Sequence, residues 1–314
     1  MTSGAFGGGQ HEAILQQCKP AVAACKELSN SADPVDLALA FKGVAAYLPI
    51  LDVIARDIPY LRTEALELAA TCALLKTILG WHRKGFTSAI HYARSAQEYS
   101  AESGNISLQL SAYSKLAWAY FLDKKYPLAL HTAEAARSLL EENNQPGKQP
   151  LSSCIQGGTY STLALMQARN NQPSDEALGK ATEIEPSTQS VAMMAFTSTD
   201  QLHEAAKTRI YQGNQTEALK LLEQLIDPET LEMKTQHHER GRLGIIRDLA
   251  LSSLRTKERD MGKTVYFWQT GMEGSRALQS EWGLQEFTTV YELMECVWPG
   301  ETGITQLRDL TIHW

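Results

Sequence analysis

Residues 107–140 read SLQLSAYSKLAWAYFLDKKYPLALHTAEAARSLL, and this stretch decides the fold. Its first half carries apolar residues at steps of three and four, which place a broad apolar face on one side of an α-helix. Those residues are Leu108, Leu110, Ala112, Tyr113, Leu116, Ala117, Tyr120 and Phe121. Asp123, Lys124 and Lys125 interrupt the run, and Pro127 suits the first turn of a second helix. The stretch therefore predicts two amphipathic helices joined by a short turn.

The same stretch resembles a tetratricopeptide repeat (TPR), which is a pair of antiparallel helices with small residues at fixed positions. Leu116 and Ala117 match the large-then-small pair of its first helix, and Tyr120 matches the aromatic residue one turn later. Ala129 and Ala136, seven residues apart, match the two small positions of its second helix. Because one helix pair cannot bury all of its apolar surface, the resemblance implies further pairs stacked against it.

Fainter copies of this pattern lie before and after it. The alanines in equivalent positions of the second helix are Ala89, Ala129, Ala177 and Ala218. Their spacings are 129 − 89 = 40, 177 − 129 = 48 and 218 − 177 = 41 residues, which exceed the ~34 of the standard repeat. A fifth pair is expected over residues 233–256 and 261–280. We therefore expect an all-α fold, a right-handed superhelical solenoid of TPR-like antiparallel helix pairs.

The predicted organisation is one TPR-like helical repeat domain over residues 10–300. Residues 1–9 are rich in glycine and are expected to form a flexible leader, and residues 301–314 are expected to form a C-terminal helix or tail. Pro20 falls inside a predicted helix and is expected to kink or end it, and Pro49 is expected to bend the next helix.

Two connecting segments differ in character. Residues 143–150, NNQPGKQP, are polar and rich in turn formers, which predicts a loop. Residues 186–199, PSTQSVAMMAFTST, contain an apolar centre at 191–196 that is too hydrophobic for a free loop. That centre is expected either to begin a helix or to lie against the groove of the array.

Composition and charge limit the function classes. The 314 residues are 43% hydrophobic, and 29 basic against 36 acidic residues give a net charge of −7, which argues against direct nucleic-acid binding by this chain. The sequence contains no run of about 18 apolar residues, so we expect no membrane span. The N-terminus lacks the pattern of a secretory signal. Five scattered cysteines fit reduced thiols and a cytoplasmic location.

At the level of the whole chain, the sequence resembles the C-terminal repeat half of bacterial helix-turn-helix (XRE-type) transcriptional regulators. The phrases DPVDLALAFKGVAAYL, YLRTEALELAATCALLKTILGW and SAYSKLAWAYF carry this resemblance. It implies a concave groove that senses a ligand or docks a partner, often a peptide, and a role in transcription regulation. The resemblance departs at the N-terminus, because no DNA-binding helix-turn-helix precedes residue 10.

Catalytic and metal motifs are weak. His237, His238 and Glu239 form the one local cluster, but adjacent side chains on a helix point about 100° apart and so do not chelate one ion easily. No HExxH motif or paired-cysteine spacing accompanies them, and Gly157-Gly158 lacks the lysine of a phosphate loop. We expect no catalytic residue, no metal and no cofactor. An enzyme using His238 or a cysteine is the alternative without a positive motif.

The groove candidates are aromatic and basic side chains on first helices of the predicted pairs. The aromatic side chains are candidates to anchor a bound segment, and their alternative role is packing in the core. The basic side chains are candidates to bind carboxylates of a ligand, and their alternative is a solvated helix face. They are Tyr113, Trp118, Phe121, Lys207, Arg209, His238 and Arg242. The sequence thus predicts a non-catalytic module that binds a peptide or protein segment, and it is compatible with a homodimer. The alternative is a ligand-sensing regulatory domain whose effector domain is absent from this chain.

Overall fold

A computed structural model describes residues 5–145, 147–148, 150–235 and 237–312. In these residues the regular structure is helical apart from one short two-stranded sheet, which confirms the all-α prediction. The chain divides into two compact units, one ending at Gln201 and one beginning at Leu202. Each unit has its own core and is described by itself.

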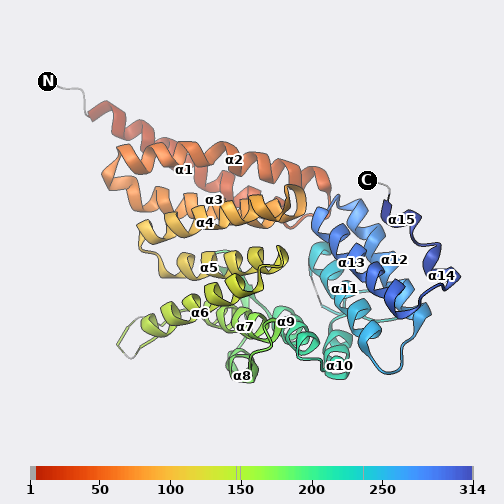
Figure 1. Cartoon of the computed structure of the whole chain (residues 1–314). Helices are drawn as coiled ribbons and strands as arrows, with labels where there is room; N and C mark the ends of the chain where they lie inside the picture. Colours follow the sequence, from red (N-terminus) through yellow and green to blue (C-terminus); the bar gives the residue numbers. More distant parts are fainter. Residues whose placement is uncertain (1–4, 146, 149, 236, 313–314) are drawn as a thin grey trace. The chain divides into compact units, whose positions relative to one another are not determined.

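The first unit contains eight α-helices among its described residues. They are α1 (Ala5–Leu28), α2 (Pro34–Asp57), α3 (Arg62–Arg83), α4 (Gly85–Ser103), α5 (Ile106–Leu122), α6 (Tyr126–Asn143), α7 (Ser153–Arg169) and α8 (Asp175–Glu183), with a 3-10 turn at Pro59–Leu61 (Figure 1). Each helix packs on the next, and α1, α3, α5 and α7 also contact one another in turn. We call these four helices the odd-helix layer.

Capping residues explain where several helices begin and end. The Asp33 carboxylate accepts a hydrogen bond from the Val35 N–H at 2.7 Å and starts α2, and Asn105 caps α5 in the same way. Gly104, with a φ of 75°, ends α4 in the left-handed conformation that glycine tolerates. Lys124, with a φ of 58°, turns the chain between α5 and α6. The predicted helical hairpin over residues 107–140 is therefore confirmed as α5 and α6.

The N-terminal region differs in detail from expectation. Helix α1 begins at Ala5, so residues 5–9 of the expected leader are helical, whereas residues 1–4 lie outside the described residues. Pro20 and Pro49 lie inside α1 and α2 without ending them. Each helix is 24 residues long and is held on both sides of its proline by packing, which outweighs the loss of one backbone hydrogen bond.

Helix α2 has unusual apolar character. It is the one helix, among the described residues, that is long and apolar enough to cross a membrane by length and composition. It packs on α1 and α3, and it also exposes Val35, Leu39, Ile50 and Val53. The absence of a membrane span therefore stays a prediction.

Four of the five cysteines are buried as small apolar side chains. Cys18, Cys25 and Cys72 lie in one core cluster formed by α1, α2 and α3. Burial raises the pKa of the Cys72 thiol to about 12. Cys154 is also buried, Cys296 is exposed, and all five are free thiols, as expected for an odd, scattered set.

The second unit contains the greater part of α9 and the helices that follow it. The described elements are α9 (Ser198–Tyr211), α10 (Gln215–Leu225), α11 (Glu239–Arg255), α12 (Met261–Ala277), α13 (Glu281–Val297), α14 (Thr302–Thr305) and α15 (Asp309–Ile312). Its core centres on Phe267, Trp268 and Phe287, and the Trp268 indole N–H donates to the Phe287 carbonyl oxygen at 2.6 Å. The range 301–314 thus holds two short helices, with residues 313–314 outside the described residues.

Helix α11 begins later than the expected residue 233. Pro228 follows α10, and the Asp227 carboxylate accepts hydrogen bonds from the N–H groups of Glu229 and Thr230 at 2.8 and 3.1 Å. This local turn occupies backbone donors that a helix would need, and a single bridge pairs Ile226 with Met233. The described residues 227–235 and 237 therefore lie outside any helix, and His238 caps α11.

Candidate functional site

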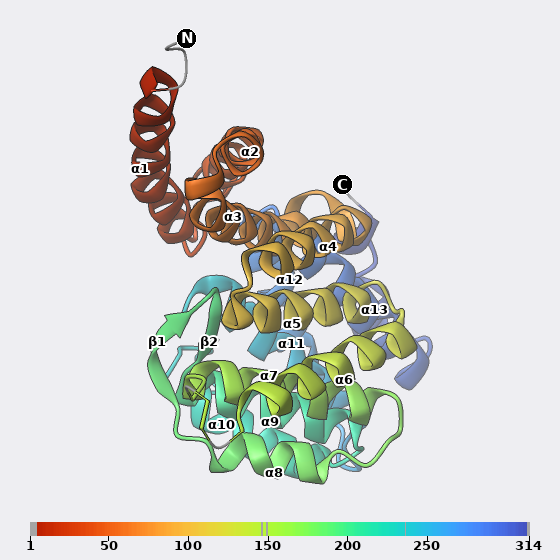
Figure 2. The same ribbon diagram turned by 90° about the vertical axis from the view of Figure 1, so that its left-hand side faces the viewer.

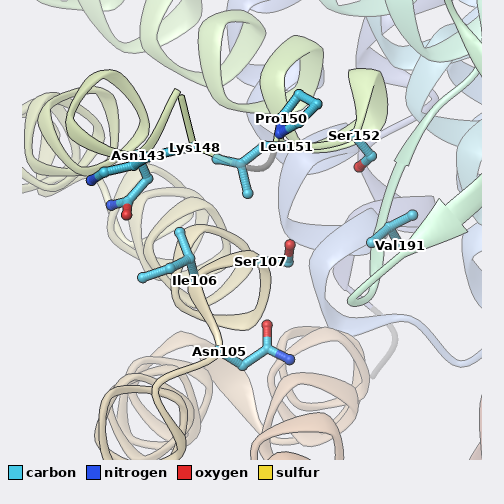
Figure 3. Close-up of a pocket in the computed structure, with 9 residues that line it drawn as sticks. All are labelled: Asn105, Ile106, Ser107, Asn143, Lys148, Pro150, Leu151, Ser152 and Val191. Carbon is cyan, nitrogen blue, oxygen red and sulfur yellow. The ribbon is translucent and has the colours of Figure 1, made fainter. Parts of the chain in front are cut away.

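A cavity of about 610 Å³ lies in the first unit where α5 and α7 begin (Figure 3). Its lining residues are Asn105, Ile106, Ser107, Asn143, Lys148, Pro150, Leu151, Ser152 and Val191. Asn105 and Ser152 are the N-cap residues of α5 and α7, so two helix N-termini meet this cavity. Its lining mixes amide, hydroxyl and ammonium groups with apolar side chains, which suits a ligand that carries both backbone and apolar groups.

Much of the polar lining is already hydrogen-bonded inside the protein. The Asn105 amide donates to the Glu67 carboxylate at 2.9 Å while its oxygen accepts from the Leu108 N–H at 3.1 Å. The Lys148 ammonium donates to the Glu142 carbonyl oxygen at 2.6 Å. Asn105 is therefore held in one orientation at the floor of the cavity.

A β-hairpin lies beside this cavity and contributes Val191 to its lining. Strand β1 (Ser187–Val191) pairs antiparallel with β2 (Met194–Phe196), and Val191 lies opposite Met194 (Figure 2). Ala192 and Met193 make the two-residue turn with φ values of 47° and 65°. The apolar centre at residues 191–196 is expected either to begin a helix or to lie against the groove of the array. It does not begin a helix, because α9 starts at Ser198, and it instead belongs to a hairpin that packs on α5, α6 and α7.

The hairpin packs on a surface supplied mainly by α5, α6 and α7. Met194 and Phe196 are 3% and 1% exposed, and the Cys154 thiol donates a hydrogen bond to the Met194 carbonyl oxygen. We call this surface the docking surface; its members are Leu110, Ala136, Leu140, Cys154, Ile155, Gly157 and Gly158. Burial raises the pKa of the Cys154 thiol, which keeps it protonated as a donor.

The two glycines of α7 make room for the hairpin. A Cβ on Gly157 would lie 2.2 Å from a ring carbon of Phe196, and a Cβ on Gly158 would lie 2.4 Å from the Met194 sulfur. Real Cβ atoms do not approach other atoms this closely. Gly157-Gly158, which lacks the features of a phosphate loop, therefore serves close packing of an extended strand.

The predicted aromatic anchors fall into two places, with Tyr113 apart from Trp118 and Phe121. Tyr113 is partly buried against the cluster that includes Met194 and Phe196. Trp118 instead contacts Phe121 edge to face, with 5.4 Å between the ring centroids. Phe121 contacts Tyr126 in the same geometry, with 5.8 Å between the ring centroids. Phe121 is 6% exposed. Of the three residues, Tyr113 is thus the one that packs with the hairpin.

The predicted basic candidates all lie in the second unit, and each contacts neighbouring groups. Lys207 pairs with Glu204 at 2.7 Å, and Arg209 pairs with Glu217 at 3.2 Å. Arg242 pairs with Glu239 at 2.7 Å and also donates to the Leu231 carbonyl oxygen. His238 is the N-cap of α11, and its Nδ1 accepts from the Gly241 N–H at 2.8 Å. Lys207, Arg209 and Arg242 thus each have a carboxylate partner within the second unit.

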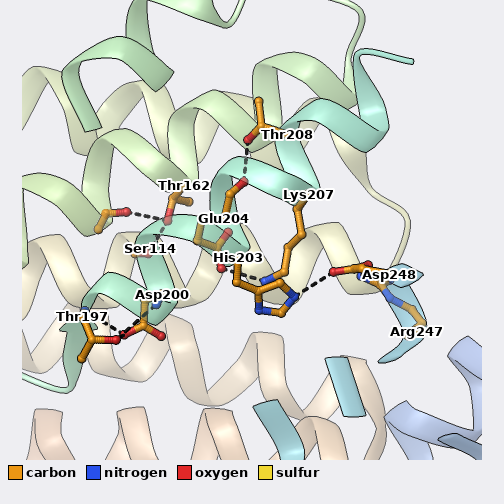
Figure 4. Close-up of polar contacts among 11 residues, drawn as sticks. Ser114, Thr162, Thr197, Asp200, His203, Glu204, Lys207, Thr208, Arg247 and Asp248 are labelled. Carbon is orange, nitrogen blue, oxygen red and sulfur yellow. Dashed lines mark hydrogen bonds and ion pairs between the residues drawn. The ribbon is translucent and has the colours of Figure 1, made fainter. Parts of the chain in front are cut away.

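A buried ionic network in the second unit was not predicted from the sequence (Figure 4). His203 Nε2 lies 2.8 Å from the Asp248 carboxylate, whose other oxygen pairs with Arg247 at 2.6 Å. Arg247 also pairs with Glu286 of α13. The network therefore joins α9, α11 and α13 through side chains.

The charge states in this network follow from burial and from pairing. Burial and the nearby Lys207 lower the pKa of His203, so the imidazole is neutral and donates Nε2–H to Asp248. Burial alone would raise the pKa of Asp248, but Arg247 and His203 hold it below its usual value. A neutral imidazole, a carboxylate and a guanidinium are thus fixed together in the core.

Metal binding finds no support in the described residues, because they contain no group of three or more His, Cys, Asp or Glu side chains placed to hold an ion. Comparison with protein families, with curated proteins and with solved structures found no match to this chain. The described part of the chain is thus a mainly helical protein of two units, with a cavity beside a β-hairpin in the first.

Proposed function

We propose that the chain is a non-catalytic protein-interaction module that binds an extended peptide segment of a partner. One observation carries the proposal: strand β2 lies extended on the docking surface, beside a cavity of about 610 Å³. A surface that already holds one extended strand has the shape and apolar pockets that peptide recognition uses. Tyr113 and the cavity residues Ser107 and Ser152 are the groups we expect a bound segment to contact.

The finer fold assignment belongs to the same proposal. We infer a right-handed superhelical solenoid of TPR-like pairs, in which the odd-helix layer lines the concave face. The contacts of α1 with α3, α3 with α5, and α5 with α7 support this inference, because stacked helix pairs bring their first helices together. The buried key alanines Ala89, Ala129, Ala177 and Ala218 also support it.

The other expectations stay part of the proposal. The partner is a peptide or protein segment, nucleic acid and membrane are not partners, and the location is cytoplasmic. The basic residues Lys207, Arg209, His238 and Arg242 form a second candidate surface, in the second unit. Light scattering on the purified chain would measure whether it forms the homodimer that the sequence allows.

A ligand-sensing regulatory domain is the second candidate function, as the resemblance to transcriptional regulators implies. The polar lining favours it, because Asn143, Lys148, Ser107 and Ser152 surround the cavity and suit a small polar ligand. Such a ligand would stabilise the chain against heat without competing with any peptide. A peptide ligand would instead compete with other peptides for the same residues.

A display library of extended peptides, selected on the intact chain, tests the proposal. Selected peptides are then cross-linked to the chain with a photoreactive amino acid at the half-buried Ser107, and a matched variant carries it at Glu134 on α6, which is also half-buried. We expect cross-links from position 107 and none from position 134. Failure to select any binding peptide, or equal cross-linking at both positions, would overturn the proposed function.

A further inference from the structure

We infer that the β1–β2 hairpin is a tethered occupant of the peptide site, and that the site selects an extended segment with apolar side chains two residues apart. The first side chain is flexible, like Met194, and the second is aromatic, like Phe196. This inference rests on the proposed function and adds to it the chemistry of the partner. The hairpin would then compete with that partner for the docking surface.

The docking surface fixes the spacing of the two side chains. Met194 and Phe196 point to the same side of β2 and are buried, whereas Ala195 between them is exposed. Gly158 leaves room for the Met194 thioether, and Gly157 leaves room for the Phe196 ring. A segment with its apolar side chains on adjacent residues would place one of them in solvent.

One backbone contact fixes the depth of the strand. The Cys154 thiol donates to the Met194 carbonyl oxygen, which every peptide residue carries. This contact therefore suits any extended segment and does not depend on the sequence of the hairpin. Specificity comes from the two pockets, and alignment comes from the backbone.

The turn of the hairpin is the reason that a partner can replace it. Ala192 and Met193 both have positive φ values, 47° and 65°, at a two-residue turn where asparagine and glycine are favoured. Residues with a Cβ are disfavoured in this region. The turn is held by packing, because Ala192 and Met193 lie against the cluster of Ala70, Ala73 and Leu74 on α3 with Leu108 and Ala112 on α5. A separate linear segment fills the same pockets without that turn.

Strand β1 adds little burial to offset the strained turn. The middle of β1, residues 188–190, is exposed, and its ends are partly buried. A polar contact from α1 reaches it, because the Lys26 ammonium donates to the Ser190 hydroxyl at 2.9 Å. The hairpin is thus held mainly by Met194, Phe196 and the turn residues.

The test uses the intact chain and a fluorescent synthetic peptide of residues 192–199, AMMAFTST. A second peptide, MAAMFTST, exchanges the alanines and methionines, so that none of its methionine and phenylalanine side chains lie two residues apart. Three variants are compared with the parent chain. Met194→Ser with Phe196→Ser releases the hairpin, Ala192→Gly relaxes its turn, and Ala195→Gly is the matched control at an exposed position of β2.

We expect the released variant to bind AMMAFTST at least tenfold more tightly than the parent chain does. It should bind MAAMFTST at least tenfold more weakly than AMMAFTST. Ala192→Gly should weaken peptide binding by about fivefold, because a glycine removes the left-handed penalty and strengthens the tethered occupant. Ala195→Gly should change binding less than twofold. Equal affinity of the parent and released variants for AMMAFTST would overturn the inference.

Alkylation of Cys154 gives a second readout that does not depend on peptide affinity. In a Cys296→Ser background, mass spectrometry would report Cys154 as protected in the parent chain and alkylated in the released variant. Adding AMMAFTST should protect it again. If the released variant does not fold, Ala192→Gly and the exchanged peptide still decide, because neither removes a buried side chain.

Failure of this inference and failure of the proposed function give different results. If display peptides bind and cross-link at position 107 without a two-residue spacing, and hairpin variants do not change their affinity, the proposed function stands and the tethered-occupant inference is wrong. If no display peptide binds the parent chain but AMMAFTST binds the released variant, the site is an internal one and the proposed function is wrong.

Discussion

Gly157 and Phe196 are in such close contact that a Cβ on the glycine would lie 2.2 Å from the Cε1 atom of the aromatic ring. The glycine lies inside α7 and the ring belongs to β2, 39 positions further along the chain (196 − 157 = 39). The missing side chain of one residue is thus the space that the other fills. Substitutions at this position can therefore separate two effects of glycine: its low helix propensity, and the space that it leaves for a neighbouring side chain.

Gly157→Ala should lower the free energy of unfolding by about 1–3 kcal/mol, because the added methyl group forces the Phe196 ring to move. Gly179→Ala is the matched control, because Gly179 also lies in a helix but nothing surrounds its Cβ position within 4 Å. That control should raise the stability by about 0.5–1 kcal/mol through helix propensity alone. Urea unfolding followed by circular dichroism measures both, and equal shifts would show that the ring does not need the space.

The stability should fall as the pH drops below about 6.5, the ordinary pKa of an unfolded histidine. The folded protein lowers the pKa of His203, so below that pH the unfolded chain binds a proton that the folded chain resists. Lys207, Glu204 and Asp248 are the charged groups near this imidazole. The slope contributed by His203 is at most about 1.4 kcal/mol per pH unit.

His203→Gln, which keeps an N–H donor for Asp248, should flatten this part of the pH dependence. Urea midpoints at pH 7.5, 6.0 and 5.0 for the parent and the variant measure it. Asp248 has a lowered pKa in the folded state and adds stability above its unfolded pKa of about 3.9, which is lost as the pH falls further. Identical profiles for parent and variant would show that His203 does not titrate on unfolding.

Asp248→Asn should destabilise the chain by about 3–5 kcal/mol, because it leaves the Arg247 charge without one of its buried carboxylates. The side chains of Arg247 and Asp248 are 5% and 1% exposed. Glu239→Gln is the control, since it breaks the Arg242 pair, whose side chains are 23% and 27% exposed. That more exposed pair should contribute about 1 kcal/mol or less. Thermal unfolding of both variants would rank them, and a reversed order would contradict the assigned network.

Trp268→Phe should lower the stability by about 2–4 kcal/mol, because it opens a cavity and removes the indole hydrogen bond to the Phe287 carbonyl oxygen. Tyr266→Phe is a neighbouring control on the same helix, where the lost hydroxyl bond to the Glu229 carbonyl oxygen is exposed. We expect that control to stay within about 0.5 kcal/mol of the parent chain. Differential scanning calorimetry distinguishes them, and similar losses in both would show that the indole is not central to this core.

The helices could be predicted from the sequence because their signals are local. The turn at residues 123–125 separates two apolar periodicities, and α12 (Met261–Ala277) begins at the expected residue 261. The helix α1 begins earlier than predicted. Residues 5–9 carry three glycines and no apolar period, so the sequence gives no helix signal there. Helix propensity alone does not reveal a helix that continues from a packed segment.

The candidate site could not be predicted in the same way, because its residues are far apart in the sequence and come together only in the folded chain. The turn Ala192-Met193 lacks the glycine or asparagine that marks a two-residue hairpin, so the strand pair gave no local signal. The roles of Gly157 and Gly158 depend on β2, and the pairing of His203 with Asp248 joins positions 45 apart. One signal did exist: Arg247 and Asp248 interrupt the apolar run GIIRDLALSSL, where buried charges need partners.

The packing of each helix on its chain neighbour has a kinetic consequence. Contacts between adjacent helices close short loops, and proteins rich in such contacts fold quickly. The hairpin is different, because Ser190 contacts Lys26 across 164 positions and Met194 contacts Cys154 across 40. Its docking therefore completes the first unit late in folding, as a slow phase that follows fast helix assembly. A growing chain on the ribosome exposes the docking surface until residues 187–196 have been synthesised.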